Sequence, residues 1–269
     1  MSVPAGVAAN ASPTQTPAPL LPLVLVHGFL GGGAQWADQQ VALGSDRAVV
    51  PIDLPGFGAR AAALAPESIA GFALDMLDGL TERGITHFDL LGHSMGGMIV
   101  QEMIARAPER IGKLILYATS ASGAMPDRFE TFAVSRARAA NDGPAATADR
   151  IAATWFRRGS SAPRYAGCAK IARCASLSAI NAGLTAMENW SRAEDVAAIT
   201  APTLIVWGDQ DHSYGWAQIE TLWREISGAR LAVVPGCAHA VHLEKPALFN
   251  AILTDFLRED EQEMHASAE

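Results

Sequence analysis

Short runs of apolar residues alternate along this chain with longer amphipathic stretches. Runs rich in Val, Ile and Leu, each too short for a helix, predict strands at about 23–27, 48–53, 87–92, 113–119, 202–207 and 230–234. Helical periodicity predicts helices at about 67–83, 96–107, 214–227 and 246–258. This alternation is typical of an α/β fold, in which helices cover both faces of a mostly parallel central sheet.

A long insertion interrupts this pattern after the fourth strand. The stretch between residues 119 and 202 is far longer than one crossover helix requires, and it has helix-forming composition with scattered aromatic residues. We therefore expect a core made of residues 21–121 and 196–260, with a helical cap at 122–195. Residues 1–20 are rich in Ala, Pro and Thr and are expected to be a disordered lead, and residues 261–269 a disordered tail.

Composition narrows the classes of partner. Of the 269 residues, 49% are hydrophobic and 18% charged, as in an ordinary globular protein, and the formal net charge is −8. No cluster of Lys and Arg offers a surface for nucleic acid or an anionic membrane, and no apolar run is long enough to span a bilayer. The three cysteines, an odd number outside any C-x-x-C spacing, favour a reducing compartment. We expect a cytoplasmic protein, monomeric or homodimeric, whose partner is a small-molecule substrate.

The most specific motif lies where the third predicted strand ends. Residues 88–97 read FDLLGHSMGG, so a G-x-S-x-G string follows an apolar strand and leads into a helix. Such a nucleophile elbow holds a serine on a strained turn, and the flanking glycines remove side chains that would collide where strand meets helix. The pattern makes Ser94 the candidate nucleophile.

A glycine-rich loop follows the first predicted strand. Residues 27–33 read HGFLGGG, and such a loop lets backbone N–H groups approach a ligand. Acyl transfer requires donors where the carbonyl oxygen becomes an anion. We expect the backbone N–H groups of Phe29 and Met95 to form this oxyanion hole, and His27 to be a structural hydrogen-bonding residue.

These motifs together resemble the α/β-hydrolase superfamily, in particular its branch of serine-nucleophile esterases and enol-lactonases, over roughly residues 20–258. The family order is nucleophile, acid, histidine. In the W-G-x-x-D segment at 207–211 the resemblance assigns the acid to Asp211, while Asp209 is expected to shape the turn. The run at 236–246 is similar to the family pattern G-H-x-x-H-x-E-x-P and assigns the catalytic histidine to His239, although Ala238 replaces the usual glycine.

The resemblance implies a triad in which His239 takes the proton of Ser94 and Asp211 orients the imidazole. No metal is expected, because the histidines lack a metal-ligand spacing, and no cofactor, because phosphate-binding glycine motifs are absent.

The substrate is the least determined feature, because the cap decides it and one core serves many reactions. Leu30, Trp155 and Trp190 are candidate pocket residues, and the cap residues Arg157, Arg158, Arg164 and Arg173 could pair with a substrate carboxylate. Ester or lactone hydrolysis is the preferred interpretation. Carbon–carbon bond hydrolysis of a ring-cleavage dienoate and a hydrolase-like binding protein without turnover are the alternatives.

Overall fold

The computed structural model describes residues 20–126 and 128–266, with side chains described to residue 258. The expectations for the lead at 1–19 and for the last residues, 267–269, lie outside this range. Within it, parallel strands form one sheet in the order β2-β1-β3-β4-β5-β6. The strands are β1 (Leu23–Val26), β2 (Val49–Ile52), β3 (Phe88–His93), β4 (Ile111–Tyr117), β5 (Thr203–Gly208) and β6 (Arg230–Val234). Each lies within two residues of its predicted position, and the α/β class is confirmed.

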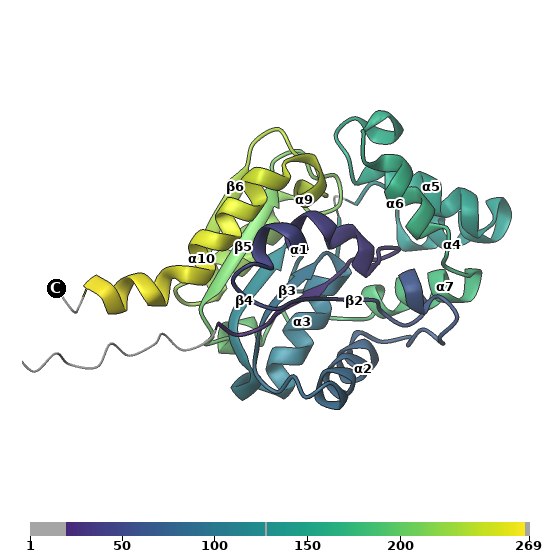
Figure 1. The fold of residues 1–269 in the computed structure, drawn as a ribbon. Coiled ribbons are helices and arrows are strands. Elements are labelled where there is room, and N and C mark those ends of the chain that lie inside the picture. The colour runs from purple at the N-terminus through teal and green to yellow at the C-terminus, as the bar shows by residue number, and fades with distance from the viewer. Residues whose placement is uncertain (1–19, 127, 267–269) are drawn as a thin grey trace, which may run out of the picture.

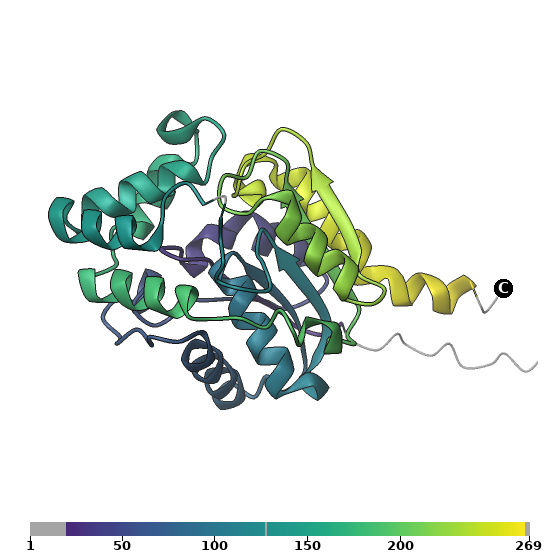
Figure 2. The same ribbon diagram turned by 180° about the vertical axis from the view of Figure 1, so that it is seen from behind.

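Helices cover both faces of the sheet, as Figures 1 and 2 show from opposite sides. One face carries α1 (Ala37–Leu43) and α10 (Pro246–Ala266), and the other carries α2 (Ile69–Glu82), α3 (Met95–Arg106) and α8 (Trp216–Glu225). The strands alternate accordingly, since Leu23 and Leu25 pack in the cluster with α10, whereas Val24 and Val26 pack with α2 and α3. Two apolar cores therefore hold the sheet from either side.

Two helices differ from expectation. The short helix α1 was not predicted, because its sequence ADQQVAL carries too few apolar positions to show a helical period. The last helix, α10, continues to Ala266 and so covers most of the segment expected to be a disordered tail. The remaining short elements are α9 (Val241–Glu244) and the 3-10 helices η1 (Gly33–Trp36), η2 (Gly58–Arg60), η3 (Pro108–Arg110), η4 (Gly159–Ser161) and η5 (Val196–Ala198).

The inserted segment between β4 and β5 is helical and gathers as a lobe to one side of the sheet (Figures 1 and 2). It contains α4 (Phe132–Asp142), α5 (Pro144–Thr154), α6 (Tyr165–Ala172) and α7 (Leu177–Glu188). Its helix starts follow local rules: the Thr131 and Ser176 side chains cap α4 and α7, and Pro144 occupies the first position of α5. Its ends meet in an antiparallel bridge between Ser122 and Ser191.

Candidate active site

Ser94 lies at the sharp turn between β3 and α3. Its backbone has φ 56° and ψ −120°, a conformation that is strained for any residue except glycine. The flanking glycines allow the crossing: a Cβ at Gly92 would lie 2.3 Å from the Gly96 carbonyl oxygen, and a Cβ at Gly96 would lie 2.4 Å from that of Val26. The Ser94 amide donates to the Tyr117 carbonyl at 2.9 Å, which fixes the turn to the next strand. The sequence thus folds into the nucleophile elbow that its glycines predict.

The glycine-rich loop after β1 faces this elbow, because a Cβ at Gly28 would lie 2.9 Å from the Ser94 Cβ. The loop turns through Leu30, which has φ 61° and is fully buried, and the Gly31 amide donates to the Gly28 carbonyl at 2.9 Å. Among the described residues, no hydrogen bond uses the Phe29 amide. Met95 is the first residue of α3, where helical N–H groups lack intrahelical partners. Both amides predicted for an oxyanion hole are therefore available beside Ser94.

His27 holds the loop from behind. Its Nε2 accepts the Leu54 amide at 3.0 Å, so its Nδ1 carries the proton and donates to the Gly28 carbonyl at 2.8 Å. Complete burial lowers the pKa of His27 to about 4. Asp53 secures the same region, because its Oδ1 accepts the amides of Gly33 and Ala59 at 2.9 and 3.0 Å. His27 and Asp53 therefore fix the glycine-rich loop, and none of these hydrogen bonds involves Ser94.

Asp211 and His239 form a hydrogen-bonded pair. The Asp211 Oδ2 atom lies 2.8 Å from His239 Nδ1, and the Asp211 side chain is fully buried. Its other oxygen accepts the amides of Ser213 at 2.7 Å and Tyr214 at 3.4 Å, which fixes the carboxylate. The alternative acid, Asp209, instead accepts the Gly236 amide at 2.6 Å and so shapes the turn. The geometry therefore pairs His239 with Asp211.

The backbone of His239 is held by two side chains that sequence analysis did not single out. Its carbonyl oxygen accepts hydrogen bonds from His93 Nε2 and from the Tyr117 hydroxyl, each at 3.0 Å. His93 and Tyr117 are partners in the β3–β4 register, and their rings stack with centroids 4.4 Å apart. Burial lowers the pKa of His93 well below its usual value, so the ring is neutral. His93 and Tyr117 can be recognised as a pair only from the register of β3 against β4, which the sequence alone does not supply.

Tyr214 is a neighbour of both His239 and Ser94. Its ring stacks on His239 with centroids 5.7 Å apart, and the side chain is completely buried. Burial raises the pKa of Tyr214, and the nearby Ser94 hydroxyl offsets part of this rise. The two hydroxyls do not form a hydrogen bond, because the buried phenol oxygen of Tyr214 has no hydrogen-bond partner among the described residues. Ser94 also makes no direct hydrogen bond to His239, a contact that is often long in enzymes without substrate.

The cap contacts the histidine loop directly. The Ala240 amide donates to the Trp155 carbonyl at 2.9 Å, and Glu244 bridges the Ala238 and Arg157 amides at 2.6 and 2.9 Å. Glu244 thus holds Ala238, the residue that departs from the family pattern, through its backbone amide. Helix α7 also approaches the oxyanion loop, because a Cβ at Gly183 would lie 2.7 Å from the Phe29 ring.

Comparison with known proteins decides the family. The family described as alpha/beta hydrolase matches residues 23–252. The chain belongs to the α/β hydrolase family. A protein of Pseudomonas savastanoi pv. phaseolicola named carbamate hydrolase RutD is 28% identical over 243 residues, covering 88% of this chain and 93% of that protein.

Solved structures agree on the fold of this α/β hydrolase. The enol-lactonase from Burkholderia xenovorans superposes with a TM-score of 0.80 at 23% identity, over 88% of this chain and 91% of that one. A thermophilic esterase from Thermogutta terrifontis gives 0.80 at 24% identity, over 89% and 90%. These likenesses establish the fold, and the family match together with the sequence relatives named as hydrolases makes the chain an enzyme of this family.

The expected pocket residues of the hydrolase occupy different places. Trp155 lines a narrow gap together with Phe29 and His239, beside the predicted oxyanion hole. The Trp190 indole instead donates to Glu102 at 3.4 Å, two turns along α3 from the nucleophile, within a network that includes Arg192. Leu30 is fully buried in the apolar core. Only the contacts of Trp155 favour a role at the site.

The cap arginines considered from sequence also separate. Arg164 pairs with Asp38 at 2.8 Å and Arg173 with Asp149 at 2.6 Å, and both are more than half exposed.

All three cysteines, Cys168, Cys174 and Cys237, are free thiols. Over the described residues, no three His, Cys, Asp or Glu side chains are grouped to hold a metal ion, and no helix has the length and apolar character to cross a membrane.

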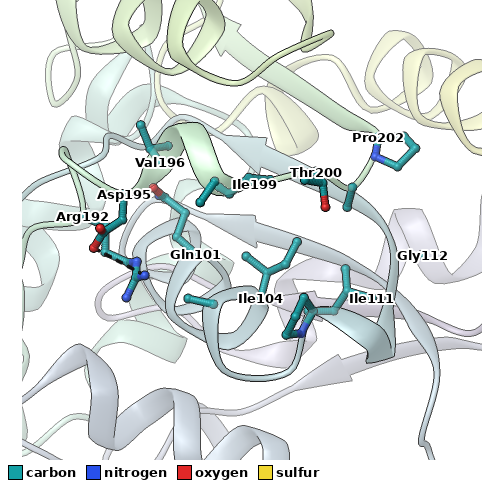
Figure 3. Close-up of a pocket in the computed structure, with 14 residues that line it drawn as sticks. Gln101, Ile104, Ile111, Gly112, Arg192, Asp195, Val196, Ile199, Thr200 and Pro202 are labelled. Carbon is teal, nitrogen blue, oxygen red and sulfur yellow. Dashed lines mark ion pairs between the residues drawn. The ribbon is translucent and has the colours of Figure 1, made fainter.

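A larger pocket of the hydrolase, of about 390 Å³, lies away from these residues (Figure 3). It is lined by the end of α3, the starts of β4 and β5, and the segment of η5, with the Arg192–Asp195 ion pair at one end. In a parallel sheet these elements meet at the edge where the strands begin, opposite to Ser94, Asp211 and His239. Ligands of open α/β sheets bind at the carboxyl ends of strands, so the elbow remains the candidate active site.

Proposed function

We propose that this protein is a serine hydrolase that cleaves a carboxylic ester or lactone of a small molecule through an acyl-enzyme intermediate. The observation that carries the proposal is the buried Asp211–His239 pair at the same end of the sheet as Ser94 in its elbow. His239 Nδ1 donates to Asp211, so its Nε2 carries the free lone pair that a general base needs.

These positions support the following reaction. His239 Nε2 takes the proton of Ser94 as its oxygen attacks the substrate carbonyl, and the amides of Phe29 and Met95 stabilise the oxyanion. The imidazolium then gives that proton to the departing alcohol oxygen, leaving an acyl ester on Ser94. Water attacks the acyl group with His239 again as base, which releases the acid and restores the serine. Asp211 stabilises the imidazolium in both halves.

The neighbours support this chemistry without fixing the substrate. An enol-lactonase and an esterase share the fold, and a sequence relative bears the name of a carbamate hydrolase. Ester, lactone and carbamate carbonyls all undergo acyl transfer, and we place esters and lactones first because the elbow and the acid segment resemble that branch.

A panel of esters, lactones, carbamates and ring-cleavage dienoates, assayed with wild-type protein and with Ser94→Ala, tests the proposal. We expect esters or lactones to be hydrolysed, a fluorophosphonate to label Ser94, and Ser94→Ala to lose roughly 10⁵-fold in kcat while melting normally. Ser178→Ala, at an exposed cap position, is the matched control. If only the dienoates are turned over, the protein is a carbon–carbon bond hydrolase that uses the same three residues. If Ser94 is labelled but no substrate is turned over, the protein is a hydrolase-like binding protein.

A further inference from the structure

A cluster of polar side chains lies inside the cap, formed by Arg128, Glu130, Ser135 and Arg150. The Glu130 carboxylate, whose side chain is only 9% exposed, is its centre. One oxygen accepts the Ser135 hydroxyl at 2.5 Å and Arg150 Nη1 at 2.6 Å, and the other lies 3.8 Å from the half-exposed Arg138. Such a network is stable only when its charges and hydrogen bonds are matched.

The cluster has more positive than negative charge. The Arg128 guanidinium lies over the rings of Phe129 and Phe132, 4.5 and 4.9 Å from their centroids, and its Nη1 donates to the Ser135 hydroxyl and the Glu130 carbonyl. Among the described residues, no hydrogen bond uses its other nitrogens, and Arg150 Nη2 is buried without a partner. The Glu130 carboxylate is therefore bonded to Arg150, whereas the bonds of Arg128 go to a backbone carbonyl and a hydroxyl, which are uncharged. A buried cation without a counter-charge is costly, so an anion bound here would stabilise the cluster.

The loop carrying Arg128 is tied to the loop carrying Tyr214. Gln218 makes the connection, because its Nε2 donates to the Ala124 carbonyl at 3.0 Å and its Oε1 accepts the Gly215 amide at 2.9 Å. Arg128 and Tyr214 influence each other across this junction: burial lowers the pKa of Arg128, and Tyr214 is among the groups that act on it electrostatically. The Tyr214 oxygen is buried and unpartnered, and the Ser94 hydroxyl is among the groups that act on the pKa of Tyr214.

We propose that Arg128 and the Tyr214 hydroxyl bind a carboxylate of the substrate that is separate from the scissile carbonyl group, so that the enzyme prefers ester or lactone substrates that carry a free acid group. The unused donors of a guanidinium match the two oxygens of a carboxylate, and a phenol with a raised pKa stays protonated as a further donor. This inference rests on the proposed hydrolase function and names its substrate class. Arg128 could not be recognised from the sequence, because it lies in a loop outside any motif.

Matched pairs of substrates test the inference. Mono-4-nitrophenyl esters of succinic, glutaric and adipic acid are compared with esters that have an isopropyl group in place of the carboxylate, after subtraction of spontaneous hydrolysis. Wild-type enzyme is expected to prefer at least one monoacid. Arg128→Gln should then lose roughly tenfold or more in kcat/KM for that monoacid, mainly through KM, and stay within about threefold for its neutral partner.

Controls separate charge from structure. Arg164→Gln removes a cap arginine that is 55% exposed and paired with Asp38. It should leave kcat/KM unchanged for both the monoacid and the neutral ester. Arg128→Lys keeps the charge without the planar fork and should recover part of the monoacid activity if Arg128→Gln folds poorly. Equal losses for both members of a pair, or a wild-type enzyme without preference for any monoacid, would overturn the inference.

Binding distinguishes failure of the inference from failure of the proposed function. If the wild-type protein hydrolyses no ester, calorimetric titration of wild type, Ser94→Ala and Arg128→Gln with succinate, glutarate and adipate still decides the anion site. Binding to the first two proteins that is lost in Arg128→Gln supports the site. No binding to wild type, or equal binding to all three, refutes it.

Discussion

The Tyr117 hydroxyl donates a 3.0 Å hydrogen bond to the carbonyl oxygen of His239, from the strand next to the nucleophile's own. The same hydroxyl accepts the His242 amide at 3.2 Å, so one side chain fixes the histidine loop at two points. His239, the proposed catalytic base, is thus attached to the sheet through its backbone, as well as to Asp211 through its ring.

Tyr117→Phe removes these bonds and leaves the ring packing. We expect kcat to fall about tenfold with KM nearly unchanged, because His93 still holds the carbonyl but the imidazole loses part of its orientation. Steady-state measurement of kcat and KM for the variant and the parent checks this outcome. Tyr165→Phe, which removes a cap hydroxyl bonded to the Asp149 carbonyl, is the matched control. A change in KM alone would argue against a positioning role.

Asp211→Asn and Asp209→Asn form a second test. An amide at 211 cannot hold the His239 tautomer whose Nε2 is free, so kcat should fall by roughly 10⁴-fold. The Asp209 change should cost stability instead, because that carboxylate accepts the Gly236 amide, and kcat should remain within about tenfold. Kinetics and thermal melting of the two variants check both outcomes. The opposite ranking of kcat would move the acid to Asp209.

Stability should fall on mild acidification. Burial lowers the pKa of His27 to about 4 and that of His242 to about 3, whereas both have the ordinary value of 6.5 when unfolded. Below pH 6.5 the unfolded chain therefore binds protons that the folded protein does not, and at pH 5 each histidine costs roughly 2 kcal/mol of unfolding free energy. Urea titrations between pH 7 and pH 5 measure this loss.

The variant His27→Gln tests whether His27 contributes to this loss of stability on acidification. His27→Gln should be less stable at pH 7, because it disturbs the bonds to Gly28 and Leu54, yet it should lose less stability on acidification. His87→Gln, at an exposed position, should leave the pH dependence as in wild type. An unchanged slope in His27→Gln would show that other groups control acid unfolding.

Two tryptophans of the cap region should behave differently. Trp155 lines the gap beside Phe29 and His239, so Trp155→Ala should alter the ranking of esters by acyl length, by about 0.8 kcal/mol per buried methylene, and affect acetyl esters least. Trp190 bonds to Glu102, so Trp190→Ala should lower the melting temperature and keep the wild-type ranking. Chain-length profiles and melting curves of both variants decide. Identical profiles in Trp155→Ala and the parent would remove Trp155 from the pocket.

The limits of sequence inference follow from particular residues. The strands were predictable because buried parallel strands need continuous runs of Val, Ile and Leu, and the positions of Ser94, Asp211 and His239 follow from local motifs. The His93–Tyr117 pair was not, because it depends on the register of two strands. The position of Tyr214 depends on the bond from its amide to Asp211, and the link between its loop and the segment before Arg128 depends on Gln218, which is distant in sequence from that segment. Contacts between distant segments carry this information.

The two ends of the cap leave and rejoin the core at one place. The Gly123 amide donates to the Trp190 carbonyl at 2.7 Å, the Arg192 amide donates to the Ala121 carbonyl at 2.8 Å, and a side chain at Gly123 would collide with the Met187 carbonyl. An excursion that closes on itself can be exchanged as a cassette without changing the path of β4 or β5. We therefore expect that replacing the segment between Ser122 and Ser191 can change the specificity of this enzyme without disturbing its core, provided that the new segment still contacts Glu244 and the His239 loop.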